Sequence, residues 1–345
     1  MCERMKNSRV TVQDIAEYLN LSRNTVSKAL NGQYVPQRTR ELVLNAAIEL
    51  GYKSYRSVAS AKKPTATRRI ALITSRLILS NNYFVFVVRG IESAISEEEN
   101  IELLQFTTAK STFFDNLVEY LENSHVDGII CIELFGTDYI PRLVRLGYPI
   151  VFLDFPVNEM NLPDNYDIVL PESFGALKNF CLSLMRERGL KTFGFVGDCF
   201  HCMSFYERFL AMREAIYLGG AQYDPAYSIV ERDSFPYGNP KELSKALADM
   251  SALPDCFFTA NDAIAISLVQ ALKLLGKNVP NDVLVVGFDN IAETKTANPP
   301  LTTFNVDKGA LGRKLLSVLM ERIDDPRQKT QTIYVGSKPI LRQTT

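Results

Sequence analysis

From Ile70 onward, short apolar segments alternate along the chain with longer segments of helical periodicity. The apolar segments read RIALIT, IELLQF, GIICI and PIVFLD, and helical segments near 84–98 and 138–146 lie among them. The alternation therefore predicts a parallel, doubly wound α/β sheet.

The same alternation resumes in the second half of the body. A helical segment at 173–187 precedes TFGFVGD, and another at about 262–275 lies between DCFFTAND and DVLVVGFDN. About ten strands are too many for one small sheet, so we expect two lobes. The length of 345 residues and the hydrophobic fraction of 46% are consistent with two or three packed domains.

The first fifty residues follow an all-helical pattern instead. Thr11 and Asp14 resemble a capping box at the start of a first helix, which Asn20 interrupts. Ser22 is a suitable N-cap for a second, short helix, and Pro36 precedes a third. The expected inward-facing residues of the second and third helices are Val26, Ala29, Leu30, Leu42, Val43, Ala46, Ala47 and Leu50. Two short helices joined by a tight turn indicate a helix-turn-helix domain.

The second helix carries polar side chains that suit DNA recognition. Arg23, Asn24 and Ser27 lie on its outward face near its N-terminus. Arginine binds the O6 and N7 atoms of guanine in a bidentate manner, and asparagine binds N6 and N7 of adenine in the same way. In a helix-turn-helix protein this end of the helix enters the major groove. An ordinary solvated helix face is the alternative interpretation.

Charge is distributed unevenly along the chain. Residues 1–69 contain 13 Lys and Arg against 5 Asp and Glu, whereas the remainder contains 25 against 34. A basic N-terminal segment on an acidic body is typical of a protein whose first domain meets a polyanion. A solvated, Lys-rich terminus is the alternative.

Together these segments resemble a known family. TVQDIAEYLNLSRNTVSKALNG, followed by VPQRTR and ELGY, is similar to the headpiece of the LacI–GalR family of bacterial transcription regulators. The body is similar to the effector domain of that family, which is shared with periplasmic sugar-binding proteins, in DGIICIE, FTANDAIAI, VPNDVLVVGFDN, NPPLTTF and PILRQTT. The resemblance implies a small all-α helix-turn-helix DNA-binding domain followed by an α/β, two-lobed periplasmic-binding-protein-like domain with parallel sheets.

The resemblance also implies how the chain is divided. The expected parts are a DNA-binding domain at 1–53, a hinge or linker at 54–68, and an effector-binding and dimerisation domain at 69–345. The chain of this fold crosses between the lobes three times. The first lobe is therefore expected at about 70–169 and 301–330, and the second at about 170–300 and 331–343.

For the headpiece, the resemblance implies a set of DNA contacts. Thr11, Ser22 and Thr39 would hold phosphates, and Tyr34 would approach the groove from the loop after the second helix. The expected DNA-contacting residues are Thr11, Ser22, Arg23, Asn24, Ser27, Lys28, Asn31, Tyr34 and Thr39.

The hinge departs from the family pattern. Relatives usually have Ala-Arg-x-Leu here, and that leucine wedges into the minor groove when the segment folds on DNA. This chain has Val58 and Ala59 in place of Ala-Arg, and Ala61 in place of leucine. A small side chain separates stacked base pairs poorly, whereas Lys53 and Arg56 still attract phosphates. We therefore expect a weaker bend at the operator centre than typical relatives produce.

In the body, the resemblance implies an effector site in the cleft between the lobes, at the carboxyl ends of the strands. Arg208 and Asp289 lie at the positions that grip the effector in relatives. A structural ion pair is the alternative role for Arg208, and a turn cap is the alternative for Asp289. The secondary candidates are Asn261, Ser204, Phe235, Asn82, Tyr83 and Phe84. Aromatic faces pack well on a sugar ring or a base, although Phe235 is equally consistent with core packing.

Two further departures concern the ligand. Pro171-Glu172 stands where relatives often have Asp-Asn, and Ala211-Met212 stands where they often have Gly-Phe. These differences argue against a standard hexose. Glu172 has two open interpretations, namely a partner for a cationic or amino-sugar ligand and a solvated carboxylate.

Other chemistries find little support in the sequence. The chain has two His, and neither GxxxxGK[ST] nor GxGxxG occurs. DCFHC brings Cys199, His201 and Cys202 together, but these lack a second ligand pair for zinc. We therefore expect no enzyme activity, no metal and no cofactor. No apolar run is long enough to span a bilayer, and MCERMKNSR lacks the apolar core of a secretory signal, so we expect a cytoplasmic protein with no membrane partner.

The predicted function is a sequence-specific DNA-binding transcription regulator that acts as a repressor. We expect it to bind a pseudo-palindromic, double-stranded DNA operator as a homodimer. A small-molecule effector, expected to be a carbohydrate, would change operator affinity through its different affinity for two arrangements of the lobes. The alternatives are a solute-binding or sensor protein of the same two-lobed fold, and an enzyme built on the same layers.

Overall fold

The structure is a computed structural model of the 345-residue chain. It describes residues 10–30, 35–50, 52, 67–74, 82–97, 100–107, 111–135, 139–157, 162–232 and 234–345. Two of the expected DNA contacts, Asn31 and Tyr34, lie outside these residues. The altered hinge residues Val58, Ala59 and Ala61 also lie outside them.

Three short helices form an N-terminal headpiece. They are α1 (Val12–Leu19), α2 (Arg23–Leu30) and α3 (Gln37–Glu49). The backbone N–H of Asp14 donates to the Thr11 hydroxyl over 3.3 Å, and the Asp14 carboxylate accepts from the Thr11 backbone N–H over 2.7 Å. The backbone N–H of Thr25 donates to the Ser22 hydroxyl over 3.0 Å. Asn20 ends α1 in the left-handed region, with φ 53°. The predicted caps and the break between the helices are confirmed.

The headpiece has its own small core. Ile15, Val26 and Val43, one from each helix, are completely buried. Leu42 was expected to face inward, but it is 44% exposed, so that prediction is wrong. On α3 the buried residues Val43, Ala46 and Ala47 follow the three- and four-residue spacing of one helix face, and residue 42 lies about 100° away from it.

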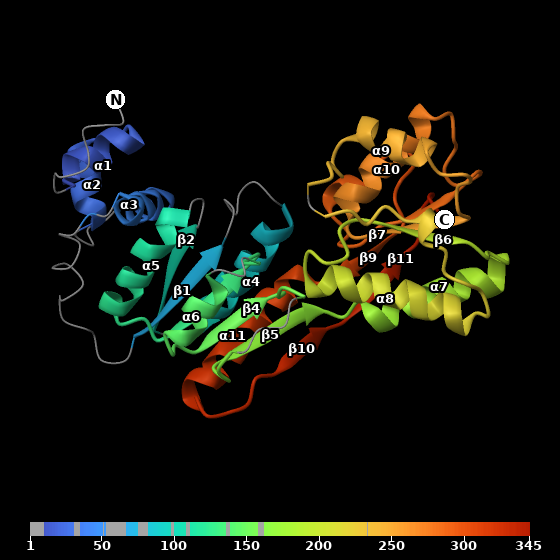
Figure 1. Cartoon of the computed structure of the whole chain (residues 1–345). Coiled ribbons are helices and arrows are strands. Elements are labelled where there is room, and N and C mark those ends of the chain that lie inside the picture. Colours follow the sequence, from blue (N-terminus) through green and yellow to red (C-terminus); the bar gives the residue numbers. More distant parts are fainter. Residues whose placement is uncertain are drawn as a thin grey trace.

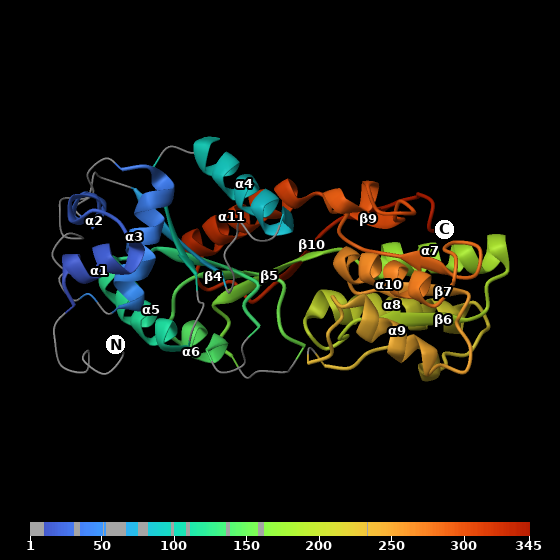
Figure 2. The ribbon, with the colours of Figure 1, turned by 90° about the horizontal axis from the view of Figure 1, so that it is seen from above.

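The first lobe contains a six-stranded parallel sheet. The strand order is β2-β1-β3-β4-β5-β10. The bounds are β1 Arg68–Thr74, β2 Ile101–Thr107, β3 Gly128–Ile132, β4 Ile150–Leu153, β5 Tyr166–Pro171 and β10 Thr332–Val335. One face is covered by α4 (Asn82–Glu97) and α11 (Lys308–Asp324), and the other by α5 (Ser111–Ser124) and α6 (Ile140–Arg145) (Figure 2). The predicted doubly wound parallel sheet is confirmed.

Side-chain alternation along β1 supplies both cores of this lobe. Ile70 and Leu72 belong to the hydrophobic cluster that includes residues of α4 and α11. Ala71 and Ile73 belong to the cluster that includes residues of α5 and α6. Because successive side chains of a strand point to opposite faces, the continuous apolar sequence of β1 fills two separate cores.

The second lobe is also an α/β layer structure (Figure 1). Its three parallel strands are β6 Phe193–Val196, β7 Cys256–Thr259 and β8 Leu284–Val286, and an antiparallel pair follows, β9 Thr303–Val306 with β11 Ser337–Ile340. One side carries α7 (Phe174–Arg188) and α8 (Met203–Leu218), and the other carries α9 (Pro240–Ala248) and α10 (Asp262–Leu274). Two short 3-10 helices are Pro225–Tyr227 and Ala292–Lys295.

The chain crosses between the lobes three times. The crossings follow β5, β9 and β10. Thr332 of β10 pairs with Ile168 of β5, so β10 belongs to the first sheet, although residues from 331 were assigned to the second lobe. Strand β9 pairs with β11, and Thr302 just before it bridges to Val286 of β8. The expected boundaries at 300 and 330 therefore shift by about six residues, because long-range pairing rather than local pattern decides where each crossing falls.

Two close contacts bind α11 into the first lobe. A Cβ atom added at Gly312 would lie 2.0 Å from the Val87 carbonyl oxygen of α4, so the two helix backbones are in direct contact. Arg322 is fully buried and forms a bidentate pair with Asp167 of β5 over 2.5 and 2.7 Å. Backbone carbonyls accept the other guanidinium hydrogens, so this buried charge is satisfied. Across the described parts of the chain, no helix has the length and apolarity needed to cross a membrane.

Candidate functional site

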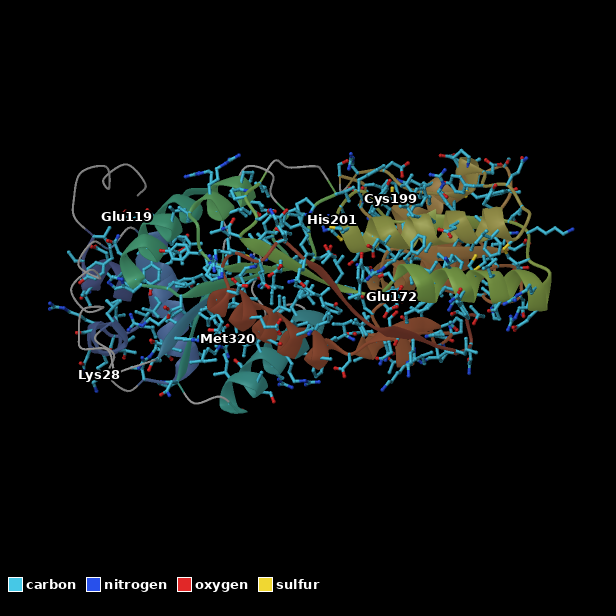
Figure 3. The ribbon with its side chains drawn as sticks, turned by 90° about the horizontal axis from the view of Figure 1, so that it is seen from below. Lys28, Glu119, Glu172, Cys199, His201 and Met320 are labelled. Atoms are coloured by element: carbon cyan, nitrogen blue, oxygen red, sulfur yellow. The ribbon has the colours of Figure 1, made fainter. Side chains whose placement is uncertain are left out.

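The outward face of α2 is polar and cationic. Arg23, Asn24 and Lys28 are exposed, Ser27 is half-buried, and the helix contains no acidic residue. Figure 3 places Lys28 on the headpiece, far from His201 of the second lobe. The helix N-terminus adds partial positive charge to the same face. This surface has the donors and the charge that DNA phosphates and base edges require.

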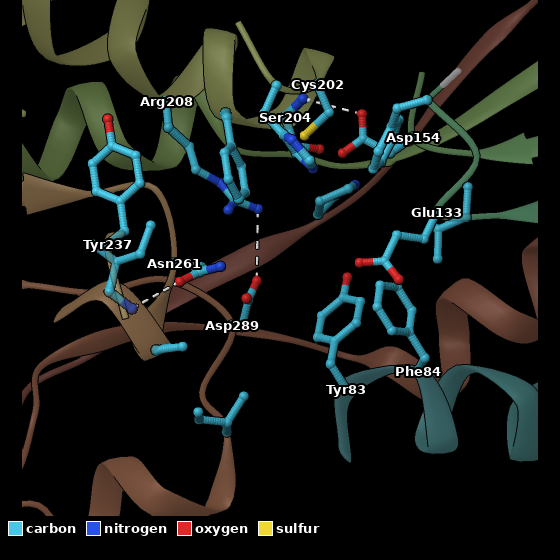
Figure 4. A pocket seen from close by; sticks show the side chains of 18 of the residues that line it. Tyr83, Phe84, Glu133, Asp154, Cys202, Ser204, Arg208, Tyr237, Asn261 and Asp289 are labelled. Carbon is cyan, nitrogen blue, oxygen red and sulfur yellow. Dashed lines mark hydrogen bonds and ion pairs between the residues drawn. The ribbon is translucent and has the colours of Figure 1, made fainter. Parts of the chain in front are cut away.

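A cavity of about 440 Å³ lies between the two lobes. Its volume falls in the range of small-molecule sites. Figure 4 shows that its wall draws on both lobes, with Tyr83 and Phe84 of α4 facing Arg208 of α8 and Asp289 after β8. The predicted effector residues on this wall are Tyr83, Phe84, Ser204, Arg208, Phe235, Asn261 and Asp289. Residues separated by up to about two hundred positions therefore meet in one cavity.

Arg208 is held by a set of buried contacts and is only 2% exposed. Its guanidinium lies 3.7 Å from the centroid of the Phe288 ring, a cation–π arrangement. Nη1 donates to the Ala260 carbonyl oxygen, and Nε donates to the Ser173 hydroxyl over 3.4 Å. Nη2 lies 3.7 Å from Oδ1 of Asp289, at the cavity. The planar donor group is thus fixed in orientation before any ligand arrives.

Asp289 occupies an unusual backbone position, with φ 114°. Its backbone N–H donates to the Phe304 carbonyl oxygen over 3.1 Å. The backbone carbonyl oxygen of Asp289 in turn accepts from the Lys308 ammonium group. Burial raises the pKa of Asp289 to about 6, although the charges of Arg208 and Lys308 act in the opposite direction. A strained residue at the wall of a cavity is typical of a functional site.

Asp262, the first residue of α10, is completely buried. Its carboxylate accepts from the Thr303 hydroxyl over 2.6 Å and from the Ile291 backbone N–H over 3.0 Å. Burial, and then the negative charge of Asp289, raise the pKa of Asp262 to about 7. The Asp262 carboxyl group is therefore protonated more readily than an exposed aspartate.

Asn261 and Phe235 each have a partner inside the protein as well. The Oδ1 atom of Asn261 accepts from the Ile264 backbone N–H over 3.0 Å and caps α10, while its amide nitrogen points toward the cavity (Figure 4). The ring of Phe235 lies 4.8 Å from that of Tyr237, and both rings line the cavity. Helix capping and cavity lining are therefore compatible roles for Asn261.

Sequence reasoning found Tyr83 and Phe84 on the first-lobe wall of this cavity but missed the part that the ends of β3 and β4 form. Glu133 follows β3 and Asp154 follows β4, and both are non-glycine residues with positive φ, 56° and 64°. The signal was present, because each acidic residue comes directly after a buried apolar strand. Parallel strands end at the same edge, so the two side chains were placed for a site there. Other lining residues that were missed are Phe135, His201, Cys202 and Tyr237.

Glu172 caps a helix, a role that neither expected interpretation included. Its carboxylate accepts from the backbone N–H groups of Gly175 over 2.6 Å and Ala176 over 3.2 Å, at the start of α7. Glu172 is therefore a half-buried helix-capping residue that lies outside the cavity wall. The first N–H groups of a helix have no partner within the helix, and the Glu172 carboxylate accepts from two of them.

The Cys199–Cys202 segment forms no metal site with the other residues that the structure describes. Among the residues that the structure describes, no group of three or more His, Cys, Asp and Glu is arranged to hold a metal ion. The His201 ring packs 4.8 Å from Phe135 and 5.4 Å from Phe205 instead. Burial raises the pKa of the Cys199 thiol to about 11, which opposes thiolate formation.

A helix-turn-helix headpiece joined to two parallel-sheet lobes around a polar and aromatic cavity defines a ligand-responsive, DNA-binding regulator. Residues 11–54 match the family model described as bacterial regulatory proteins, lacI family. Residues 182–345 match the model described as a periplasmic binding protein-like domain.

Similar proteins cover the whole chain. The HTH-type transcriptional regulator GanR of Bacillus subtilis (strain 168) is 29% identical in an alignment 343 residues long that covers 97% of this chain and 99% of GanR. The HTH-type transcriptional regulator CelR of Thermobifida fusca is 27% identical, over 98% of this chain and 99% of CelR. The HTH-type transcriptional repressor PurR of Pasteurella multocida (strain Pm70) is 27% identical over 97% of this chain and 98% of PurR. All three relatives are named as transcription regulators.

Solved structures share the fold. A transcriptional regulator CelR–cellobiose complex has a TM-score of 0.70 at 24% identity and covers 98% of this chain and 100% of that chain. A lac repressor dimer bound to operator and the anti-inducer ONPF has a TM-score of 0.66 at 22% identity, covering 98% of this chain and 99% of that chain. This chain therefore has the lacI-family helix-turn-helix domain and the periplasmic binding protein-like domain, and its neighbours are LacI-family regulators.

Proposed function

We propose that this protein is a dimeric, sequence-specific repressor whose operator affinity is set by a carbohydrate effector bound between the lobes. One observation supports this most directly. A cationic helix-turn-helix face and a preformed interlobe cavity occur in the same chain, and the cavity wall combines residues of both lobes. A ligand that contacts both lobes stabilises one arrangement of the lobes over another. It therefore also changes where the headpieces lie.

A carbohydrate suits the chemistry of the cavity. Tyr83 and Phe84 form an edge-to-face aromatic pair 5.2 Å apart, and such surfaces pack on the apolar face of a sugar ring. Arg208 offers oriented donors, and Asp289 accepts hydrogen bonds from hydroxyl groups. The solved CelR structure is described as a cellobiose complex, which is consistent with a sugar in the same fold.

A thermal-shift screen of the full chain tests the effector site. The library contains monosaccharides, disaccharides, amino sugars, sugar phosphates and nucleobases. A ligand present at 100 times its Kd stabilises the protein by about 2.7 kcal/mol. We expect at least one sugar to raise Tm, and expect Arg208→Ala and Asp289→Ala to abolish that shift.

Arg213→Ala is the matched control for the effector site. Arg213 lies on the same helix and packs over Phe209 and Tyr223, outside the cavity wall. The ligand shift should persist in this variant. A shift that survives both Arg208→Ala and Asp289→Ala would place the effector elsewhere.

Selection of duplexes from a random library tests the DNA site. The full chain should enrich a pseudo-palindromic sequence, and Arg23→Ala or Asn24→Ala should relax preference at one base pair in each half-site by about 1–3 kcal/mol. Arg145→Ala on α6 removes an exposed arginine of the body and should leave the preference unchanged. An unchanged preference in Arg23→Ala and Asn24→Ala would contradict the assignment of α2 as the recognition helix.

A further inference from the structure

Helix α8 lacks a cap from its own lobe. Its N-cap residue is Cys202, whose side chain makes no capping hydrogen bond. The first N–H groups of a helix have no partner within the helix, and a buried N–H without a partner is costly. Cys202 is only 2% exposed, so water does not replace the missing cap there.

The first lobe supplies the missing cap. The backbone N–H of Met203 donates to the Phe155 carbonyl oxygen over 2.8 Å, and that of Ser204 donates to Oδ1 of Asp154 over 3.2 Å. Asp154 and Phe155 follow β4 of the first sheet, whereas α8 follows β6 of the second. Figure 4 shows the Asp154 carboxylate meeting the start of α8 at the edge of the cavity. The two hydrogen bonds therefore join the lobes.

Asp154 is preorganised for this contact. It has φ 64°, and its Oδ1 also accepts from the following Phe155 N–H over 2.8 Å, which fixes the side chain. A carboxylate at a helix N-terminus also interacts favourably with the helix dipole. The strain of a left-handed aspartate persists only where its surroundings compensate for it, and α8 provides that compensation.

A third cross-lobe hydrogen bond reaches the same part of α8. The Tyr334 hydroxyl of β10 donates to Oε1 of Glu207 over 2.6 Å. Ser204, whose buried hydroxyl has no hydrogen-bond partner, and Arg208 lie on the same two turns and line the cavity. The helix start that bears these effector residues is thus held from the first lobe at two points.

We propose that Asp154 is a positioning residue that keeps the two lobes closed by capping α8 across the cleft. Opening the cleft removes the cap from Met203 and Ser204, so helix stability and lobe closure are one equilibrium. The inference rests on the proposed function in that closure sets effector control. The test uses neither effector nor operator. A failure of this inference can therefore be told apart from a failure of the proposed function.

The experiment measures the distance between the two lobes in the full chain by double electron–electron resonance. Spin-labelled non-canonical residues replace the exposed Arg145 of α6 and Lys273 of α10, and labelled chain is diluted in unlabelled chain so that intrachain distances dominate. Asp154→Ala should raise the ratio of open to closed molecules about fivefold, the usual effect of one lost helix cap. Asp154→Asn should stay closed, because asparagine caps helices as well as aspartate does.

Hydrogen exchange separates capping from closure. Amides 203–206 should exchange faster in Asp154→Ala, and Cys202→Ser added to that variant should restore their protection, because serine is a good N-cap within the second lobe. The double variant should nevertheless remain open, since the cap no longer comes from the first lobe. Reclosure of the double variant would overturn the proposal.

Asn239→Ala is the matched control for the cap. Asn239 caps α9 by accepting from the Lys241 backbone N–H over 3.0 Å, inside the second lobe. This variant should lose local protection in α9 and keep the closed distance. An unchanged distance in Asp154→Ala, or equal opening in Asn239→Ala, would show that Asp154 has no special role in closure.

Discussion

At the scale of single residues, the buried carboxylates beside the cavity govern how stability depends on pH. Asp262 is fully buried, and burial together with the charge of Asp289 raises its pKa to about 7. An unfolded aspartate titrates near pH 4, so between about pH 4 and 7 the folded protein binds more protons than the unfolded chain. The free energy of unfolding therefore falls as pH rises through this range.

Asp262→Asn should flatten that dependence. The amide cannot titrate. Its single oxygen can still accept from the Ile291 N–H, and its NH2 group can donate to the Thr303 hydroxyl in place of the second carboxylate oxygen. Urea denaturation at pH 5, 6, 7 and 8 should show a slope that is reduced by up to about 1.4 kcal/mol per pH unit for the lost group. The same slope in variant and parent would contradict the raised pKa.

Asp255→Asn is the control with the opposite sign. Burial raises the pKa of Asp255, but hydrogen bonds from the N–H groups of Lys191 and Thr192 outweigh it and lower the pKa overall. The stabilisation from Asp255 is present above about pH 4 and is lost as pH falls. This variant should therefore lose a constant amount of stability from pH 5 to 8, with no change in slope.

At the scale of elements, the contact between α4 and α11 depends on glycine. Gly312→Ala would place a Cβ atom 2.0 Å from the Val87 carbonyl oxygen, so the helices must move apart. We expect a loss of about 1–3 kcal/mol, measured by urea denaturation. Gly336→Ala is the control, because no neighbouring atom lies within 4 Å of its added Cβ, and its effect should stay within about 0.5 kcal/mol. Equal stability of the two variants would contradict the close approach of the helices.

The hinge gives a second prediction at this scale, which comes from sequence alone. Ala61 stands where relatives have a leucine wedge. A circular-permutation gel assay with the selected operator should show a weak central bend, and Ala61→Leu should increase the bend, because a larger side chain separates base pairs better. A strong central bend in the parent protein would refute the expectation.

At the scale of the whole molecule, the charge asymmetry should control polyanion binding. Residues 1–69 carry an excess of eight positive charges, whereas the rest carries an excess of nine negative charges. Full-length protein should bind heparin and elute with rising salt, and removal of residues 1–69 should abolish retention. Retention of the truncated chain would show that the body itself carries a polyanion site.

The sequence by itself determined the local elements of this protein. The caps at Thr11 and Ser22, the buried face of α2 and the strand–helix alternation of the body depend on residues within one or two turns, so pattern and spacing suffice to predict them. The family resemblance added Arg208 and Asp289, which do meet at one cavity.

Only the tertiary structure decided which distant groups meet. Asp154 caps a helix that begins about fifty residues later, and β10 joins the sheet of the first lobe beside β5. Glu172 acts locally, but whether its carboxylate faced a ligand or α7 depended on the crossover that precedes the helix. Such contacts follow from strand order and lobe closure, which depend on the whole chain. They produce no periodic residue pattern from which they could be predicted.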